Sequence, residues 1–161
     1  MFVYIIAIVV IAIDQWLKFL VKFHMQEGQT IPILEPFVSI TSIRNPGAAF
    51  GMLQNQTWLF ILIACAVIVA GIVFERRTSH ENRTLLRLAI GLLVGGAIGN
   101  LVDRILYKTV VDYVNVQIFV FNFADAAITF AVIFFLIDAL FRDGKQTSNS
   151  QSTAKDEVDD V

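Results

Sequence analysis

The sequence predicts an all-α membrane protein in which four transmembrane helices carry a small extracytoplasmic β-sheet. Three observations support this fold class. The 161-residue chain is 57% hydrophobic, above the roughly 45–50% of an average soluble domain. Its apolar residues gather in four blocks, each long enough to cross a bilayer, which takes about 20 helical residues. A loop between the first two blocks is rich in β-forming residues and ends in a turn signal.

The four blocks define the predicted spans. They cover residues 2–23, 57–74, 85–106 and 123–141. No basic segment precedes the first span and no clear small-residue cleavage site follows it, so we expect a retained helix rather than a signal peptide. The third span carries Gly91, Gly95, Gly96 and Gly99. Small residues four apart let helices approach closely, which predicts a central place for this span in the bundle.

Basic residues in the short loops indicate the orientation of the chain in the membrane. Arg76, Arg77 and Arg83 lie between the second and third spans, and further basic residues follow the fourth. Because short basic loops stay in the cytoplasm, we expect both termini there. The loops 24–56 and 107–122 are then extracytoplasmic.

The two outer loops contain the β-forming residues. The stretch 37–43 is rich in β-formers and runs up to the turn signal 45–47, and a second extended run covers 109–114. We therefore expect a small sheet, or cradle, on the outer membrane surface. Residues 1–143 are expected to form a single membrane-embedded domain. The polar segment 144–161 is poor in aromatic residues and is expected to be a disordered cytoplasmic tail.

Composition excludes several classes of partner and cofactor. The net charge of −2 gives no reason to expect nucleic-acid binding. One cysteine, Cys65, cannot form an intrachain disulfide. His24 and His80 lie far apart, and no His/Cys cluster has metal-ligand spacing, so we expect no metal site and no cofactor.

Polar residues in the spans need an explanation, because an ionisable side chain at the centre of a spanning helix costs at least about 2.5–3.5 kcal/mol. With the predicted orientation, five polar residues fall near the outer ends of the spans. They are Asn100, Asp103, Asp112, Asn122 and Asp125. We therefore expect three carboxylates and two amides to converge at one depth. Asp14 lies somewhat beyond the midpoint of the first span, and Lys18 follows one turn later.

Two of these carboxylates can share one pocket. Asp112 and Asp125 are thirteen residues apart, a short enough connection to bring them together. Two carboxylates in a low-dielectric pocket cannot both ionise easily, so one keeps its proton. The ionised carboxylate can act as base towards water while the protonated one donates to the scissile carbonyl. This is the chemistry of an aspartic protease, and the pair would titrate as a coupled dyad.

Structural interpretations of the same residues stay open. Asn122 and Asp125 also suit a helix start, where Asn caps the backbone and Asp favours the helix dipole. Neighbouring opposite charges are compatible with simple ion pairs, namely Asp103 with Arg104, Asp14 with Lys18, and Asp138 with Arg142. Several phenylalanines suit either membrane-surface anchors or an apolar wall for a lipid or substrate helix. They include Phe37, Phe50, Phe119, Phe121 and Phe123.

Other classes of function compete with a protease. A transporter or channel subunit also uses buried acids, but it would string them across the membrane depth. A structural subunit needs no tight set of acids and amides on separate helices. Serine and zinc proteases are disfavoured, because His24 and His80 fall on opposite sides and no His-Glu-x-x-His motif occurs.

Five blocks of the sequence, in order, resemble bacterial lipoprotein signal peptidase, or signal peptidase II. The resemblance extends from residue 1 to about residue 142. The blocks are Asp14-Gln15-x-x-Lys18, Asn45-x-Gly47-Ala48-Ala49-Phe50, Gly95-Gly96-x-x-Gly99-Asn100-x-x-Asp103-Arg104, Val110-Val111-Asp112-Tyr113 and Phe121-Asn122-x-Ala124-Asp125. The chain departs from the family at Pro46, at Ala126, where the family often has serine, and in a connection between Asp112 and Asp125 that is a few residues shorter than usual.

The resemblance implies an intramembrane aspartic endopeptidase that cuts prolipoproteins just before a diacylglyceryl-modified cysteine. It implies a multi-pass protein of the bacterial cytoplasmic membrane with its active site near the extracytoplasmic face. The implied partners are lipidated prolipoproteins and membrane lipids, and we expect a monomer.

The resemblance also assigns roles to residues. The catalytic dyad falls on Asp112 and Asp125. Positions that shape the site or hold substrate correspond to Asn45, Gly47, Asn100, Asp103, Arg104 and Asn122. Asp14 and Lys18 correspond to supporting positions.

Overall fold

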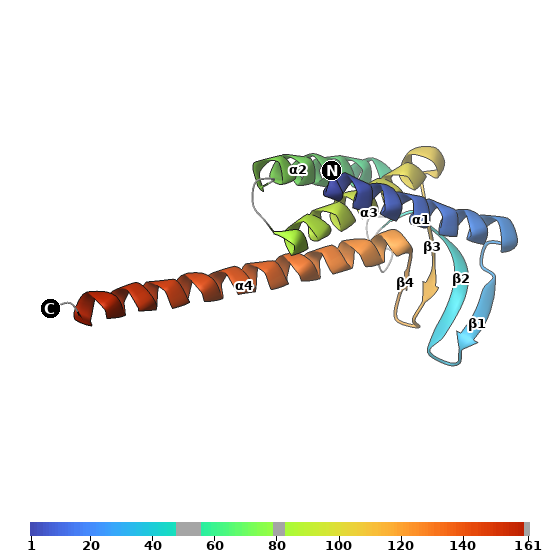
Figure 1. Ribbon diagram of the computed structural model, residues 1–161. Helices are drawn as coiled ribbons and strands as arrows, with labels where there is room; N and C mark the ends of the chain where they lie inside the picture. Colours follow the sequence, from blue (N-terminus) through green and yellow to red (C-terminus); the bar gives the residue numbers. More distant parts are fainter. Residues whose placement is uncertain (48–55, 79–82, 160–161) are drawn as a thin grey trace.

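The computed structural model of the protein describes residues 1–47, 56–78 and 83–159. Within these ranges it has four helices, α1 (Phe2–His24), α2 (Thr57–Thr78), α3 (Thr84–Tyr107) and α4 (Phe123–Asp159). The described strands are β1 (Thr30–Leu34), β2 (Val38–Asn45), β3 (Val110–Asn115) and β4 (Val120–Phe121), and they form one antiparallel sheet in the order β1-β2-β3-β4. Figure 1 shows the sheet beyond the end of the bundle at which α1 and α3 end and α4 begins. The four apolar helices and the small antiparallel sheet predicted from the sequence are confirmed.

The helices present apolar surfaces to their surroundings. Each contains a stretch long and apolar enough to cross a bilayer, which in α4 is Phe123–Phe141. Large apolar side chains such as Trp16, Leu62 and Leu136 are exposed on the outside of the bundle. Exposure of this extent on several helices suits contact with lipid rather than with water. The helical hydrogen bonds satisfy the backbone polar groups that lipid cannot.

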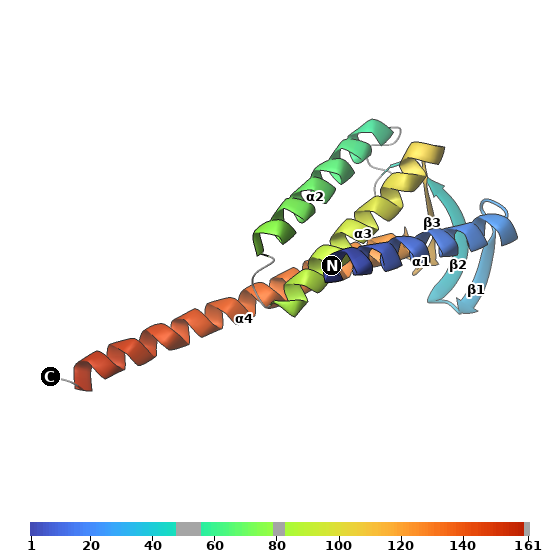
Figure 2. The same cartoon turned by 45° about the horizontal axis from the view of Figure 1, so that its top comes forward.

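Helix α3 is the centre of the bundle, as the glycines in its sequence predict. It packs against α1, α2 and α4, and Figure 2 shows it between α2 on one side and α1 and α4 on the other. Its glycines leave room for close contact with neighbouring backbones. A Cβ atom at Gly95 would lie 2.9 Å from the carbonyl oxygen of Ala7 in α1, and one at Gly96 would lie 2.6 Å from that of Ala124 in α4.

We expect Gly95→Ala to lower the thermal stability of the purified protein, with a loss of about 1–3 kcal/mol, because the added methyl group overpacks the contact between α1 and α3. The matched control is Gly71→Ala, whose Cβ would lie 2.7 Å from Cγ2 of Val94, a side-chain atom rather than a backbone atom, so a shift of one side chain can relieve the overlap and the loss should be smaller. Thermal unfolding in detergent micelles measures both variants. Equal losses in the two variants would contradict this account of the α1–α3 contact.

The sheet brings two distant parts of the chain next to each other. Strand β2 pairs with β3 so that Asn45 lies opposite Val110 and Ile43 lies opposite Asp112. The short β3–β4 hairpin then returns the chain directly to the start of α4. Asp112 and the first turn of α4 therefore lie at the same end of the bundle.

Two strands of the sheet are not predicted by the sequence analysis. Strand β1 contains Pro32 and lies at the edge of the sheet, where a residue without a backbone N–H is tolerated. Strand β4 has only two residues. Pro32 makes the first segment a weak strand candidate, and the second is too short to show an alternation.

At its far end, α4 runs to Asp159 through the polar segment that follows residue 143. That segment contains no proline, and Gly144 is its single glycine, so its composition does little to stop a helix. Asp138 forms an ion pair with Arg83, which directly precedes α3. The side chain of Arg142, its expected partner, lies outside the described part of the structure.

Candidate active site

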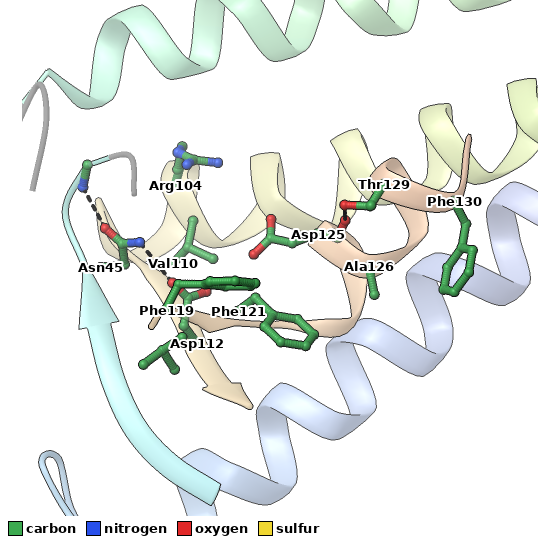
Figure 3. A pocket seen from close by; sticks show the side chains of 12 residues that line it. Asn45, Arg104, Val110, Asp112, Phe119, Phe121, Asp125, Ala126, Thr129 and Phe130 are labelled. Carbon is green, nitrogen blue, oxygen red and sulfur yellow. Dashed lines mark hydrogen bonds between the residues drawn. The ribbon is translucent and has the colours of Figure 1, made fainter. Parts of the chain in front are cut away.

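A cavity of about 470 Å³ opens where the sheet meets the ends of α3 and α4. Asp112 from β3 and Asp125 from α4 both line it, and Figure 3 shows the two carboxylates facing the same space. The other polar lining includes Asn45, Gly47, Arg104 and Thr129. The apolar lining comprises Val110, Phe119, Val120, Phe121, Ala126 and Phe130. The structure therefore brings together the two carboxylates that the sequence analysis assigns to a dyad.

Asp112 is almost completely buried and accepts two amide hydrogen bonds. Asn45 Nδ2 donates to its Oδ2 at 2.8 Å, and Asn122 Nδ2 donates to its Oδ1 at 2.6 Å. Burial, followed by repulsion from Asp125, raises the pKa of Asp112 to about 6, although the two amide hydrogen bonds act in the opposite direction. Asp112 therefore keeps a proton to a higher pH than an ordinary carboxyl group.

Asp125 is held in the first turn of α4 by a reciprocal cap. Its backbone N–H donates to Asn122 Oδ1 at 3.0 Å, and the backbone N–H of Asn122 donates to Asp125 Oδ2 at 3.3 Å. This arrangement has the pattern of a capping box. Asn100 Nδ2 donates to the other oxygen, Oδ1, at 2.7 Å. The helix-start interpretation of Asn122 and Asp125 is thus correct, and the same geometry aims Asp125 into the cavity.

A buried charge network lies behind the dyad. Lys18 is fully buried, and its Nζ lies 2.9 Å from Asp14 Oδ2 and 3.1 Å from Asp103 Oδ2. Asp14 Oδ1 also accepts the backbone N–H of Ala124 at 3.0 Å, which caps the start of α4. Asp103 Oδ2 accepts the backbone N–H of Val111 at 3.2 Å, which fixes β3 to α3. The expected pair of Asp14 with Lys18 is confirmed, and the network ties α1, α3, β3 and α4 together.

Asp103 does not belong to the cavity. It pairs with Lys18 and, at 3.4 Å, with Lys22, whereas the sequence left open a pair with Arg104. The Arg104 side chain instead lines the cavity, with its guanidinium carbon 4.9 Å from the ring centre of Phe60 in α2. A cation over an aromatic face is stabilised there by the charge distribution of the ring.

Several lining residues are missed by the sequence analysis. Thr129 and Phe130 lie one helical turn after Asp125 and Ala126, so helical periodicity applied to Asp125 would have found them. Thr129 Oγ1 donates to the carbonyl oxygen of Asp125 at 2.9 Å. Phe119 and Phe121, left open as anchors or wall, both line the cavity. Their rings lie 5.6 Å apart and form part of its apolar side.

The backbone of α4 receives a further anchor from β3. The hydroxyl group of Tyr113 accepts the N–H of Phe123 at 3.2 Å. Tyr113 is buried, and this burial raises the pKa of its hydroxyl group. The first turn of α4 is therefore held by Tyr113 as well as by Asn122 and Asp14.

Comparison with known proteins finds a family and a fold. The family model described as Signal peptidase (SPase) II matches residues 6–141. A lipoprotein signal peptidase of Anoxybacillus flavithermus is 48% identical over 142 residues, covering 85% of this chain and 84% of the relative. One from Geobacillus thermodenitrificans is 46% identical over 143 residues, covering 86% and 89%. A solved bacterial membrane enzyme superimposes with a TM-score of 0.81 at 34% identity, covering 89% of this chain and 90% of that structure.

Proposed function

Because the chain belongs to the signal peptidase II family, we propose that it is an aspartic endopeptidase that cuts diacylglyceryl-modified prolipoproteins just before the lipidated cysteine. The observation that supports this proposal most directly is the pair Asp112 and Asp125. The two carboxylates come from separate elements, line one cavity and are each held by amide donors. The charged network behind them gathers at the same end of the bundle, which suits a reaction site better than an ion path across the membrane.

In the proposed reaction, Asp112 carries the shared proton and Asp125 is ionised. A water molecule between them attacks the scissile carbonyl carbon and gives one proton to Asp125, while Asp112 donates its proton to the carbonyl oxygen. The tetrahedral intermediate then returns its hydroxyl proton to Asp112. Asp125 protonates the amide nitrogen, the C–N bond breaks, and the signal peptide leaves with a new carboxyl terminus.

The surrounding polar residues would position these groups. Asn45 and Asn122 hold the two oxygens of Asp112 from opposite sides, and Asn100 holds Asp125. Gly47 donates its backbone N–H to Asn45 Oδ1 at 3.0 Å and so fixes that side chain. Arg104 lines the cavity and would bind a carbonyl group of the substrate backbone. Preorganised donors of this kind are effective because they need no rearrangement as charge develops.

The apolar wall suits a substrate with a lipid and an apolar signal helix. Phe119, Phe121 and Phe130 line the cavity, next to helix surfaces that face lipid. The basic residues Arg76 and Arg77 lie in the last turn of α2. Figure 1 shows that α2 ends on the far side of the bundle from the sheet. We infer that the sheet and the dyad are extracytoplasmic and that both termini are cytoplasmic, in the bacterial inner membrane.

The pKa of Asp112 predicts the pH dependence of the reaction. Asp112 acts in its protonated form, so kcat/KM falls as pH rises through about 6.

Asn45→Ala removes a donor that favours the ionised form of Asp112. The pKa of Asp112 then rises, and the falling limb of the pH profile moves to higher pH. This shift is tested by initial rates measured from about pH 4 to about pH 9, which spans the pKa of an ordinary carboxyl group and the raised pKa of Asp112. A limb in the same place in both proteins would contradict the role of Asp112 as acid.

Cleavage of paired substrates tests the substrate class. The purified protein is mixed with a prolipoprotein carrying diacylglyceryl on its cysteine and with the same protein unmodified. We expect cleavage of the modified form only. Equal cleavage of both forms would overturn the requirement for lipid. If neither is cut, the peptidase proposal fails, and proton or ion flux into liposomes becomes the next measurement.

A further inference from the structure

Three amide side chains surround the dyad, and each turns its NH2 group towards a catalytic carboxylate. They are Asn45 and Asn122, which donate to Asp112, and Asn100, which donates to Asp125. An amide side chain has one accepting end and one donating end, and its neighbours decide which way it points. The direction of these amides matters because the opposite direction would place an oxygen against a carboxylate.

Two of the amides are directed by the main chain. Asn45 Oδ1 accepts the backbone N–H of Gly47, and Asn122 Oδ1 accepts that of Asp125, both at 3.0 Å. A backbone N–H can only donate, so it fixes the oxygen end of the amide. The NH2 end is then left for Asp112.

Asn100 is directed by a side chain instead. Its Oδ1 accepts Nζ of Lys18 at 2.9 Å and, at 3.2 Å, Nδ2 of Asn122. An ammonium group has three donors and no acceptor. The bond from Lys18 is the shorter of the two and comes from a charged donor, which makes it the stronger one.

Lys18 has no freedom to turn away from Asn100. The three acceptors around its ammonium group are Asp14 Oδ2, Asp103 Oδ2 and Asn100 Oδ1, at 2.9, 3.1 and 2.9 Å. They match its three donors. The lysine is fully buried, so water cannot replace any of them.

We propose that Lys18 is a positioning residue for the catalytic base: it sets the direction of Asn100, and Asn100 in turn holds Asp125 Oδ1 at 2.7 Å. This role rests on the proposed function, because it gives Asp125 a task in the chemical step. Lys18 itself touches neither the cavity nor the dyad. Its hydrogen-bonded link to the dyad passes through one amide, and its charge also acts on Asp112 through space, favouring the ionised form of that carboxyl group.

Lys22 is a matched control for the charge of Lys18. It also pairs with Asp103, at 3.4 Å, but it is partly exposed and lies over the ring of Tyr107. Within the described contacts it makes none with Asn100. Removing Lys22 therefore removes a positive charge from the same carboxylate without changing the direction of the amide.

A double-mutant cycle tests the proposal through kcat and KM on a lipidated prolipoprotein. The proteins are the wild type, Lys18→Met, Asn100→Ala and the double variant, with Lys22→Met as control. We expect Asn100→Ala to lower kcat about 10–100-fold, the size of a lost charge-assisted hydrogen bond, with KM nearly unchanged. Lys18→Met should lower kcat about tenfold, and the double variant should be no slower than Asn100→Ala, because residues that act through one another are not additive. Lys22→Met should retain the wild-type kcat.

Two results would overturn the role of Lys18. One is a double variant whose loss is the product of the two single losses, since Lys18 would then act independently of Asn100. The other is a Lys18→Met protein with wild-type kcat. A wild-type protein that cuts no substrate would instead overturn the proposed function, and the role of Lys18 with it.

A second background keeps the test valid if Lys18→Met does not fold. Asp103→Asn removes one of the carboxylates that Lys18 neutralises and keeps an oxygen for the N–H of Val111. The same cycle is then measured with Asp103→Asn as the reference protein. The same non-additivity is expected, and additive losses would again reject the proposal.

Discussion

We expect Asp112→Asn and Asp125→Asn each to lower the rate of prolipoprotein cleavage by about 10³-fold or more, because either change removes half of the proposed acid–base pair. Asparagine has nearly the same shape as aspartate but only one accepting oxygen, so each variant keeps one of its two hydrogen bonds and places its NH2 group against the other donor. The effect should appear in kcat, since neither carboxylate is needed to hold the apolar parts of the substrate. Steady-state kinetics on a lipidated prolipoprotein measures the loss.

The control for the dyad is Asp138→Asn. Asp138 lies on the same helix as Asp125 but pairs with Arg83 at the opposite end of the bundle. Its variant should cut at the wild-type rate. Thermal unfolding of all three variants shows whether the fold survives. A well-folded Asp112→Asn or Asp125→Asn protein with normal activity would refute the catalytic assignment.

Asp14→Ala will destabilise the protein by about 3–5 kcal/mol, the usual cost of removing one partner from a buried ion pair. The substitution takes an acceptor from fully buried Lys18 and leaves the N–H of Ala124 without its cap. Asp14→Asn keeps an acceptor for one of these two donors and should cost less. The stability is measured by thermal unfolding in detergent micelles.

Asp138→Asn is also the control for this loss of stability, because its pair with Arg83 is partly exposed and exposed pairs contribute about 1 kcal/mol or less. Asp14 supports the site without touching the dyad, so the folded fraction of Asp14→Ala should retain most of its kcat. An Asp14→Ala protein as stable as Asp138→Asn would contradict the structural role of the buried network.

The four apolar helices and the gathering of polar residues at one end of the bundle could be predicted from the sequence. Apolar runs of about 20 residues have few alternatives to a transmembrane helix. The cost of polar groups in lipid makes residues such as Asn100 and Asp125 conspicuous. Orientation by basic loops then places both at one end, where the structure brings them into contact.

Spacing alone could not predict which of the aspartates share the cavity. Asp103 and Asp112 both fall near the end of the third span, and either would reach Asp125 by sequence distance. Asp103 forms an ion pair with Lys18 instead. The pairing of β2 with β3 places Asn45 within hydrogen-bond distance of Asp112. Both are contacts between distant segments, which local patterns do not encode.

Most of the ion-pair partners near the site also come from distant segments and could not be predicted from local patterns. Sequence neighbours suggest Asp103 with Arg104, yet the partners of Asp103 are lysines on α1, about 80 residues away. Arg104 meets Phe60 on α2. Only the pair of Asp14 and Lys18, which lie one turn apart on one helix, could be read from the sequence.

Mass spectrometry of the products identifies the bond that the protein cuts. The wild-type protein is incubated with a diacylglyceryl-modified prolipoprotein, and the masses of both fragments identify the broken bond. We expect one cut, which leaves the lipidated cysteine as the new N-terminus and releases the intact signal peptide. An uncut substrate, or a cut at any other bond, would contradict the proposed function.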